Sequence, residues 1–162
     1  MSDFFTKTDL SRKDAESIIS ETLNNCDDGE LYLENSKSES IVLDDDKIKS
    51  SSYSSDLGYG LRAVTGEVVA YSHSNEISKK SLKQSASNLS STLKSQNGIY
   101  NHEISQTNEK FYKDVNPIEE KSLQSKLDLL KEVNNYTRAK GGMVQQVTAS
   151  FAGEHKSIEI IR

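Results

Sequence analysis

The residues best suited to metal chemistry in this chain are three histidines, and each stands alone in the sequence. They are His73, His102 and His155. A zinc site needs imidazole, thiolate or carboxylate ligands that converge on one ion, and a helix supplies two of them at a spacing of about four residues. His102-Glu103 begins like such a helix, but Gln106 and Thr107 follow where a second ligand is expected. We therefore predict no catalytic, cofactor-binding or metal-ligating residue in this sequence.

Two other patterns could bind ligands, and each has a plainer structural interpretation. Asp44-Asp45-Asp46 clusters carboxylates but lacks the spaced ligands and glycine of a calcium loop, so we predict a solvated hairpin turn. Residues 58–63 match the dinucleotide fingerprint GxGxxA, which functions only where a helix N-terminus follows. A strand and a turn are expected here instead. We therefore assign Gly58 and Gly60 a conformational role, a hinge with φ > 0 and close approach of the backbone.

Arg62 is the one charged residue of Leu61–Val64, which alternates so that Leu61 and Ala63 share one face. Two interpretations remain open for its side chain. It either extends along the rim of a sheet into solvent, or forms an ion pair across a domain or subunit boundary. Gly66 lies in the tight turn Thr65-Gly66-Glu67. Gly58, Gly60, Arg62 and Gly66 are thus the candidates for structural or interface roles.

Composition limits the partners and the size of the core. The hydrophobic fraction is 33%, the mean hydropathy is −0.68 and the net charge is −5, so we expect a thin core that further chain or a partner completes. Nucleic acids and anionic membranes are not expected as partners, because phosphate binding needs clustered Lys and Arg. The single Cys26 cannot form an internal disulfide, and no signal peptide or membrane span is evident. These features favour the cytoplasm.

Hydrophobic periodicity predicts an α+β fold, a mainly antiparallel twisted sheet with about three helices on one side, in one domain spanning 1–162. The helices are expected at 10–25, 78–94 and 119–140, the last with a stripe of Leu123, Leu127, Leu130, Val133 and Tyr136. The first strand is expected at 30–34, with a bend near 35–39 before it resumes at 40–43. Short turns then join 47–53, 61–64 and 68–72 as a meander. Ser95–Asn108 is expected to be a polar connection.

Four sequence stretches occur in an order that suggests a family. They are SES-x-VL, D-x-K-I-K, S-x-D-x-G-x-G-x-R-A-V-x-G-E and VTAS, between Ser38 and Ser150. This succession resembles the N-terminal region of the TldD/PmbA family of metallopeptidases, also called modulators of DNA gyrase, and on the TldD side of it. The chain departs from the family pattern at Tyr59 and at Val68–Tyr71.

The resemblance implies a function for a longer parent protein. Such proteins are cytosolic zinc peptidases that process unfolded or leader peptides with a PmbA-like partner subunit or as a homodimer. Their zinc ligands lie on a helical His-Glu motif and a distal cysteine of a C-terminal domain, which is absent from this chain. We expect that domain to follow, since SIEIIR reads as a strand with no turn after it. The segment itself would then shape substrate access and dimer assembly.

Two other hypotheses remain open at this point. The chain could be a stand-alone module that captures extended peptides at an exposed sheet edge, without protease activity. It could also belong to a homologue that has lost catalysis and serves as an assembly subunit. The gene beyond codon 162 distinguishes the three hypotheses, according to whether it stops, continues with a His-Glu-x-x-x-x-x-His helix, or continues without it.

Overall fold

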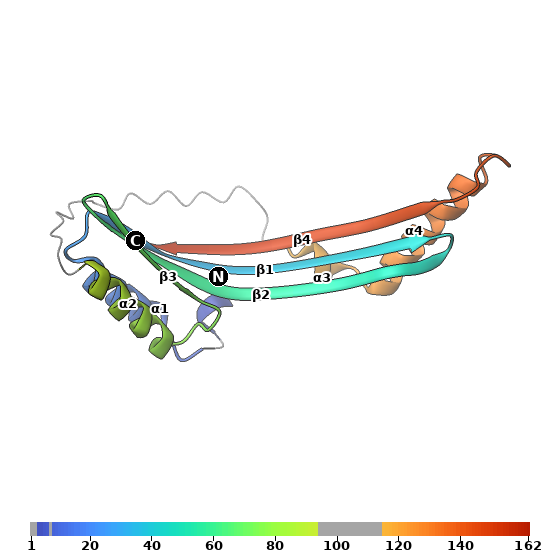
Figure 1. Ribbon diagram of the computed structural model, residues 1–162. Helices are drawn as coiled ribbons and strands as arrows, with labels where there is room; N and C mark the ends of the chain where they lie inside the picture. The colour runs from blue at the N-terminus through green and yellow to red at the C-terminus, as the bar shows by residue number, and fades with distance from the viewer. Residues whose placement is uncertain (1–2, 7, 94–114) are drawn as a thin grey trace. The chain divides into compact units, whose positions relative to one another are not determined.

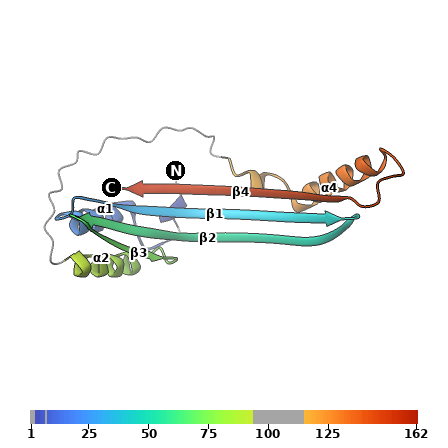
Figure 2. The same ribbon diagram turned by 45° about the horizontal axis from the view of Figure 1, so that its top comes forward.

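The computed structural model of the chain describes residues 3–6, 8–93 and 115–162. Its elements are η1 (Asp3–Phe5), α1 (Arg12–Leu23), β1 (Asp28–Asp44), β2 (Lys47–Thr65), β3 (Val68–Ser74), α2 (Lys79–Leu93), α3 (Pro117–Glu120), α4 (Leu123–Arg138) and β4 (Thr148–Ile161) (Figure 1). The strands form one sheet in the order β3-β2-β1-β4 (Figure 2). The predicted α+β class is confirmed. His102 and the predicted connection at 95–108 lie outside the described residues.

The chain divides into two compact units. Unit 1 comprises Met1–Asn35, Asp56–Glu109 and Ser157–Arg162, and unit 2 comprises Ser36–Ser55 and Lys110–Lys156. Strands β1, β2 and β4 each contribute residues to both units. Each unit has its own cluster of buried hydrophobic side chains.

In unit 1, helices α1 and α2 cover one face of the sheet (Figure 1). Helix α1 begins two residues later than predicted, at Arg12, because the Ser11 hydroxyl accepts a hydrogen bond of 3.1 Å from the Asp14 backbone N–H and caps the helix. Ser78 caps α2 in the same way, through Ser81 N–H at 3.1 Å. The apolar stripe of α1 is buried: Ala15, Ile18, Ile19 and Leu23.

The strands of unit 1 alternate between a buried and a solvated face. Leu31 and Leu33 of β1 point to the helices and are fully buried, as are Leu61 and Ala63 of β2. The residues that alternate with them, among them Glu30 and Arg62, lie on the opposite face. The predicted alternation of Leu61–Val64 is therefore confirmed.

Both tight turns have the geometry that two-residue hairpins favour. Asp45 and Asp46 have φ values of 47° and 64°, so the β1–β2 turn is of type I′. Gly66 has a φ of 58° and is the first central residue of the β2–β3 turn, where a type II′ turn needs glycine. The predicted hairpin at Asp44–Asp46 and the turn at Gly66 are confirmed.

The predicted glycine hinge is wrong. Strand β2 runs without interruption from Lys47 to Thr65, and neither Gly58 nor Gly60 has a positive φ. What the structure requires at these two positions is a residue without a side chain. A Cβ at Gly58 would lie 2.8 Å from the Ser74 carbonyl oxygen, and one at Gly60 would overlap the Tyr71 hydroxyl. The bend expected at 35–39 is also absent, since β1 is continuous from Asp28 to Asp44.

In unit 2, helix α4 packs on the sheet through Leu127 and Leu130 of the predicted stripe, but not through its other members. The long helix expected at 119–140 is two helices, α3 and α4, with Ser122 as the N-cap of α4. Its buried residues are Lys126, Leu130 and Asn134, whereas Leu123, Val133 and Tyr136 are exposed. The small core of this unit contains Ile41, Leu43, Leu130 and Ala149, with Leu127 and Phe151 packed against it.

Candidate functional site: a charged sheet face, an anchored hairpin and a groove

Arg62 is the centre of an ion-pair cluster on the solvated face of the unit 1 sheet. Its Nη2 lies 2.6 Å from Asp28 Oδ2, and its Nε lies 3.4 Å from Glu30 Oε1. Glu30 Oε2 also accepts from Arg162, whose Nη2 is 3.0 Å away. Because the strand alternates, these side chains from β1 and β2 project from the same face as Arg162. Arg62 therefore pairs within its own unit.

Electrostatics in this cluster favour the charged forms of Asp28 and Arg62. The hydrogen bond from Arg62 holds the pKa of the Asp28 carboxyl below its ordinary value, and the same bond raises the pKa of the Arg62 guanidinium. Nearby, Asp27 Oδ2 accepts from the Gly66 backbone N–H at 2.6 Å, which fixes the β2–β3 turn. Because these charges pair with one another, the cluster is suited to holding β1 and β2 together, with Arg162 paired to Glu30.

The histidines do not form a metal site in the described part of the chain. His73 stacks on Tyr71, with ring centroids 5.9 Å apart, on the open side of β3. His155 lies on β4 in unit 2. Across residues 3–6, 8–93 and 115–162, no three His, Cys, Asp or Glu side chains are grouped so that they could hold a metal ion. The donor set of the described residues therefore does not fit the zinc that the family resemblance implies.

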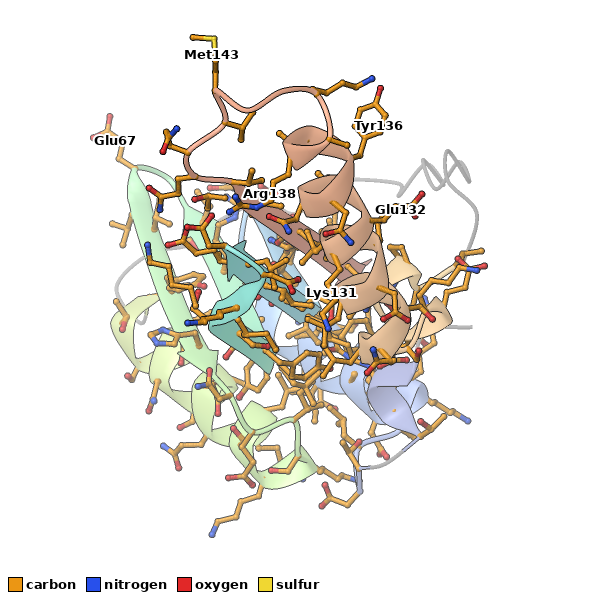
Figure 3. The ribbon with its side chains drawn as sticks, turned by 90° about the vertical axis from the view of Figure 1, so that its right-hand side faces the viewer. Glu67, Lys131, Glu132, Tyr136, Arg138 and Met143 are labelled. Atoms are coloured by element: carbon orange, nitrogen blue, oxygen red, sulfur yellow. The ribbon has the colours of Figure 1, made fainter. Side chains whose placement is uncertain are left out.

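The acidic turn of unit 2 binds its own chain. Asp44 Oδ1 accepts hydrogen bonds of 2.9 Å from both Gln146 Nε2 and Thr148 Oγ1, and these bonds lower the pKa of the Asp44 carboxyl. Asp45 Oδ1 accepts from the Val147 backbone N–H at 3.0 Å and is paired with Arg138. Figure 3 shows Arg138 near the turn, whereas Met143 points away from it. The carboxylates thus anchor the segment between α4 and β4.

A buried ion pair in unit 2 is a feature that the sequence reasoning missed. Lys126 Nζ is paired with Glu39, donates to the Ile118 carbonyl at 2.6 Å, and lies 5.6 Å from the centre of the Phe151 ring. The two charged side chains are only 5% and 11% exposed. The sequence feature that points to this ion pair is the position of Lys126, four residues before the core residue Leu130 and so on the same face of the helix.

A groove in unit 2 runs between α4 and the start of β4. Its volume is about 430 Å³. Leu129, Leu130, Val133 and Thr137 form its helical wall, and residues 146–151 form the other wall. None of the predicted candidates Gly58, Gly60, Arg62 and Gly66 lines it.

No helix among the described residues has the length and hydrophobicity needed to cross a membrane.

Comparison with known proteins gives one consistent family. Residues 29–92 match the family model described as PmbA/TldA metallopeptidase domain 1. The chain is 35% identical over 133 residues to a metalloprotease TldD homologue of Buchnera aphidicola from Acyrthosiphon pisum, covering 82% of this chain and 28% of that protein. It is 32% identical over 140 residues to the Haemophilus influenzae homologue, covering 85% and 29%. The chain thus spans less than a third of the length of these two relatives.

Solved structures share the fold at low sequence identity. A candidate modulator of DNA gyrase from Bacteroides thetaiotaomicron superimposes with a TM-score of 0.64 at 16% identity, covering 93% of this chain and 36% of that one. TldE from Thermococcus kodakarensis gives a TM-score of 0.57 at 13% identity, covering 91% and 34%. The stretch matched by the family model includes Gly58, Gly60, Arg62 and Gly66. The chain therefore belongs to the TldD/PmbA family and is an N-terminal TldD-like domain.

Proposed function

We propose that this chain is the non-catalytic N-terminal domain of a zinc metallopeptidase that processes unfolded or leader peptides. The observation that carries the proposal is the 35% identity to a metalloprotease TldD homologue over 82% of the chain. The lack of a metal-ligand group among the described residues is consistent with it, because the zinc ligands would then lie in a following domain.

The role we propose for the domain is to shape substrate access and to contribute to dimer assembly. A PmbA-like subunit is the proposed partner, supported by the shared fold with a TldE protein. A cytoplasmic location is also proposed, supported by the single buried Cys26, which forms no disulfide. The alternative is a peptide-binding module without protease activity, which the groove beside β4 favours.

The test begins with the gene that encodes this chain and the longer product that it specifies. We expect the reading frame to continue to a His-Glu-x-x-x-x-x-His helix, and the purified full-length protein to hold zinc and cleave unfolded casein. The 162-residue chain alone is expected to retain no zinc after dialysis and to cleave nothing. A full-length protein that holds no zinc and shows no turnover with its partner subunit would overturn the proposal.

A further inference from the structure

The loop that joins α4 to β4 is held at both ends by one carboxylate. Asp45 is paired with Arg138, the last residue of α4, and its Oδ1 accepts from the Val147 backbone N–H at 3.0 Å, just before β4 begins. The Asp45 backbone N–H also donates to the Val147 carbonyl at 3.0 Å. Residues 139–146, which we call the strap, therefore have their two ends fixed beside one another.

Two consecutive glycines of the strap are not required by the conformation that the structure shows. Neither Gly141 nor Gly142 has a positive φ, and a Cβ on either would meet no atom within 4 Å. Glycine at such positions lowers stability relative to alanine, because it has more freedom to lose on folding. What the pair supplies to the strap is access to other backbone conformations.

The strap carries an apolar side chain next to the apolar groove of unit 2. Met143 follows the two glycines, is 93% exposed and points outward in Figure 3. The groove, of about 430 Å³, is lined by Thr137 and Val147, which flank the strap on its two sides. Its helical wall includes Leu129 and Val133, which are 50% and 43% exposed. Four residues of chain from Val147 reach roughly 13 Å at full extension, so Met143 lies within reach of the groove.

We propose that the strap is a lid on this groove, which hinges at Gly141-Gly142 and lays the Met143 side chain against Leu129 and Val133. Burial of apolar surface on both partners drives the closure, and the flexible thioether of methionine adapts to an irregular groove. Because Asp45 already fixes the ends of the strap, closure requires no further joining of distant chain. The structure shows the open state, and in the closed state the chain occupies its own groove. Any ligand of the groove therefore competes with Met143.

The test uses the 162-residue chain with labelled methyl groups of methionine, leucine and valine. We expect nuclear Overhauser effects between the Met143 methyl group and the methyl groups of Leu129 and Val133. Met143→Ala assigns the signal, because Met1 is the other methionine of the chain. Hydrogen peroxide should convert Met143 to its sulfoxide at least about threefold more slowly than it converts the methionine of a free peptide of residues 139–147.

A matched pair of variants locates the closed position of Met143 on the helix. Val133→Asp places a charge where the thioether would lie, so it should remove the Overhauser effect to Leu129 and the protection from peroxide. Leu123→Asp is the control, because Leu123 lies on the same helix, is 55% exposed and does not line the groove. It should leave both measurements unchanged, and circular dichroism should show both variants folded.

The double variant Gly141→Ala with Gly142→Ala tests the hinge. Its methyl groups fit the open state, since neither Cβ meets another atom, so its urea midpoint should not fall. The Overhauser effects and the protection of Met143 should nevertheless decrease.

Three outcomes would overturn the inference of a lid. These are oxidation of Met143 as fast as in the free peptide, equal effects of Val133→Asp and Leu123→Asp, and full protection in the double alanine variant. Zinc content and peptidase activity of the longer protein are separate results, because each of these measurements is made on the chain alone.

Discussion

Gly58 and Gly60 face neighbours of different kinds, although both are glycines of β2. The space beside Gly58 is closed by backbone, with the Ser74 carbonyl oxygen 2.8 Å and the Asn75 Cα 3.3 Å from where a Cβ would stand. The space beside Gly60 is closed by the ring of Tyr71, whose side chain is 64% exposed and can rotate away. Backbone in a sheet cannot move without breaking its ladder.

We therefore predict that Gly58→Ala destabilises the chain more than Gly60→Ala. The first should cost about 1–3 kcal/mol, typical of overpacking, and the second should stay within about 0.5 kcal/mol, as for a surface substitution. Urea unfolding of the two variants measures the difference. Equal midpoints would show that close approach to Ser74 does not determine the choice of glycine.

The ion pair between Arg62 and Asp28 predicts a dependence of stability on pH. The pKa of Asp28 is lower in the folded chain than in the unfolded one, where it is about 3.9. The contribution of this ion pair to the free energy of unfolding is therefore present in full above the unfolded pKa of Asp28. It is lost as the pH falls through the folded pKa of Asp28. Both partners are partly exposed, with side-chain exposures of 32% and 45%, so the contribution should be below about 1 kcal/mol.

Arg62→Gln should accordingly reduce the free energy of unfolding at neutral pH and have a smaller effect at an acidic pH below the lowered folded-state pKa of Asp28, where its carboxyl is protonated. Urea titrations of the variant and the unchanged chain at both pH values provide the measurement. Lys156→Gln is a control, because Lys156 pairs with Glu154 of its own strand, with Nζ 4.0 Å from Glu154 Oε1. A loss of stability that is the same at both pH values would mean that Arg62 acts through packing and not through its charge.

For single residues, the sequence predicts which face of the sheet a side chain occupies better than it predicts which other residue that side chain contacts. Alternation placed Leu61 and Ala63 in the core and Arg62 on the other face, because the period of a strand is two. It could not reveal that Asp28, 34 positions earlier, pairs with Arg62, since the register of two strands is set by the whole sheet. The role of the glycines was misjudged for the same reason: Tyr71 and Ser74 reach them from a neighbouring strand.

Helix α4 is held to unit 2 by a buried charge as well as by apolar contacts. Lys126 connects three elements, through Glu39 on β1, the carbonyl of Ile118 on α3, and the ring of Phe151 on β4. Removing one member of a buried pair leaves the other charge without compensation in a region from which water is largely excluded. Glu39 would be that charge, because its side chain is 11% exposed.

Lys126→Met should therefore destabilise the chain by about 3–5 kcal/mol. The double variant Lys126→Met with Glu39→Gln should recover part of the loss, because no uncompensated charge is then buried. Lys131→Met, on the same helix, is the control and should have little effect. If the double variant is no more stable than Lys126→Met, the pair acts through the shape of its side chains and not through charge.

The elements themselves show which signals in the sequence are reliable. Turns were predicted correctly, at Asp44–Asp46 and at Gly66, because they depend on a few adjacent residues. The buried face of α4 was not, because periodicity counts apolar residues and placed Val133 and Tyr136 inside. The pairing with Glu39 makes Lys126 an inward-facing residue, and only the tertiary structure contains that information.

The molecule as a whole has two cores of unequal size. The core of unit 1 contains 19 buried residues among those described, and the core of unit 2 contains four. Since buried apolar surface is the main source of folding free energy, the smaller core should open more readily. Strand β1 allows a direct comparison, because it supplies Leu31 and Leu33 to the first core and Ile41 and Leu43 to the second.

Native-state hydrogen exchange should therefore show two levels of protection within this one strand. The amides of Ile41 and Leu43 are expected to exchange through an opening of lower free energy than those of Leu31 and Leu33. Lys126→Met should lower that free energy further for the unit 2 amides and leave the unit 1 amides unchanged. Leu82→Ala, in the core of unit 1, should lower the protection of Leu31 and Leu33. Equal free energies of opening along β1, shifted together by either substitution, would mean that the two units unfold as one.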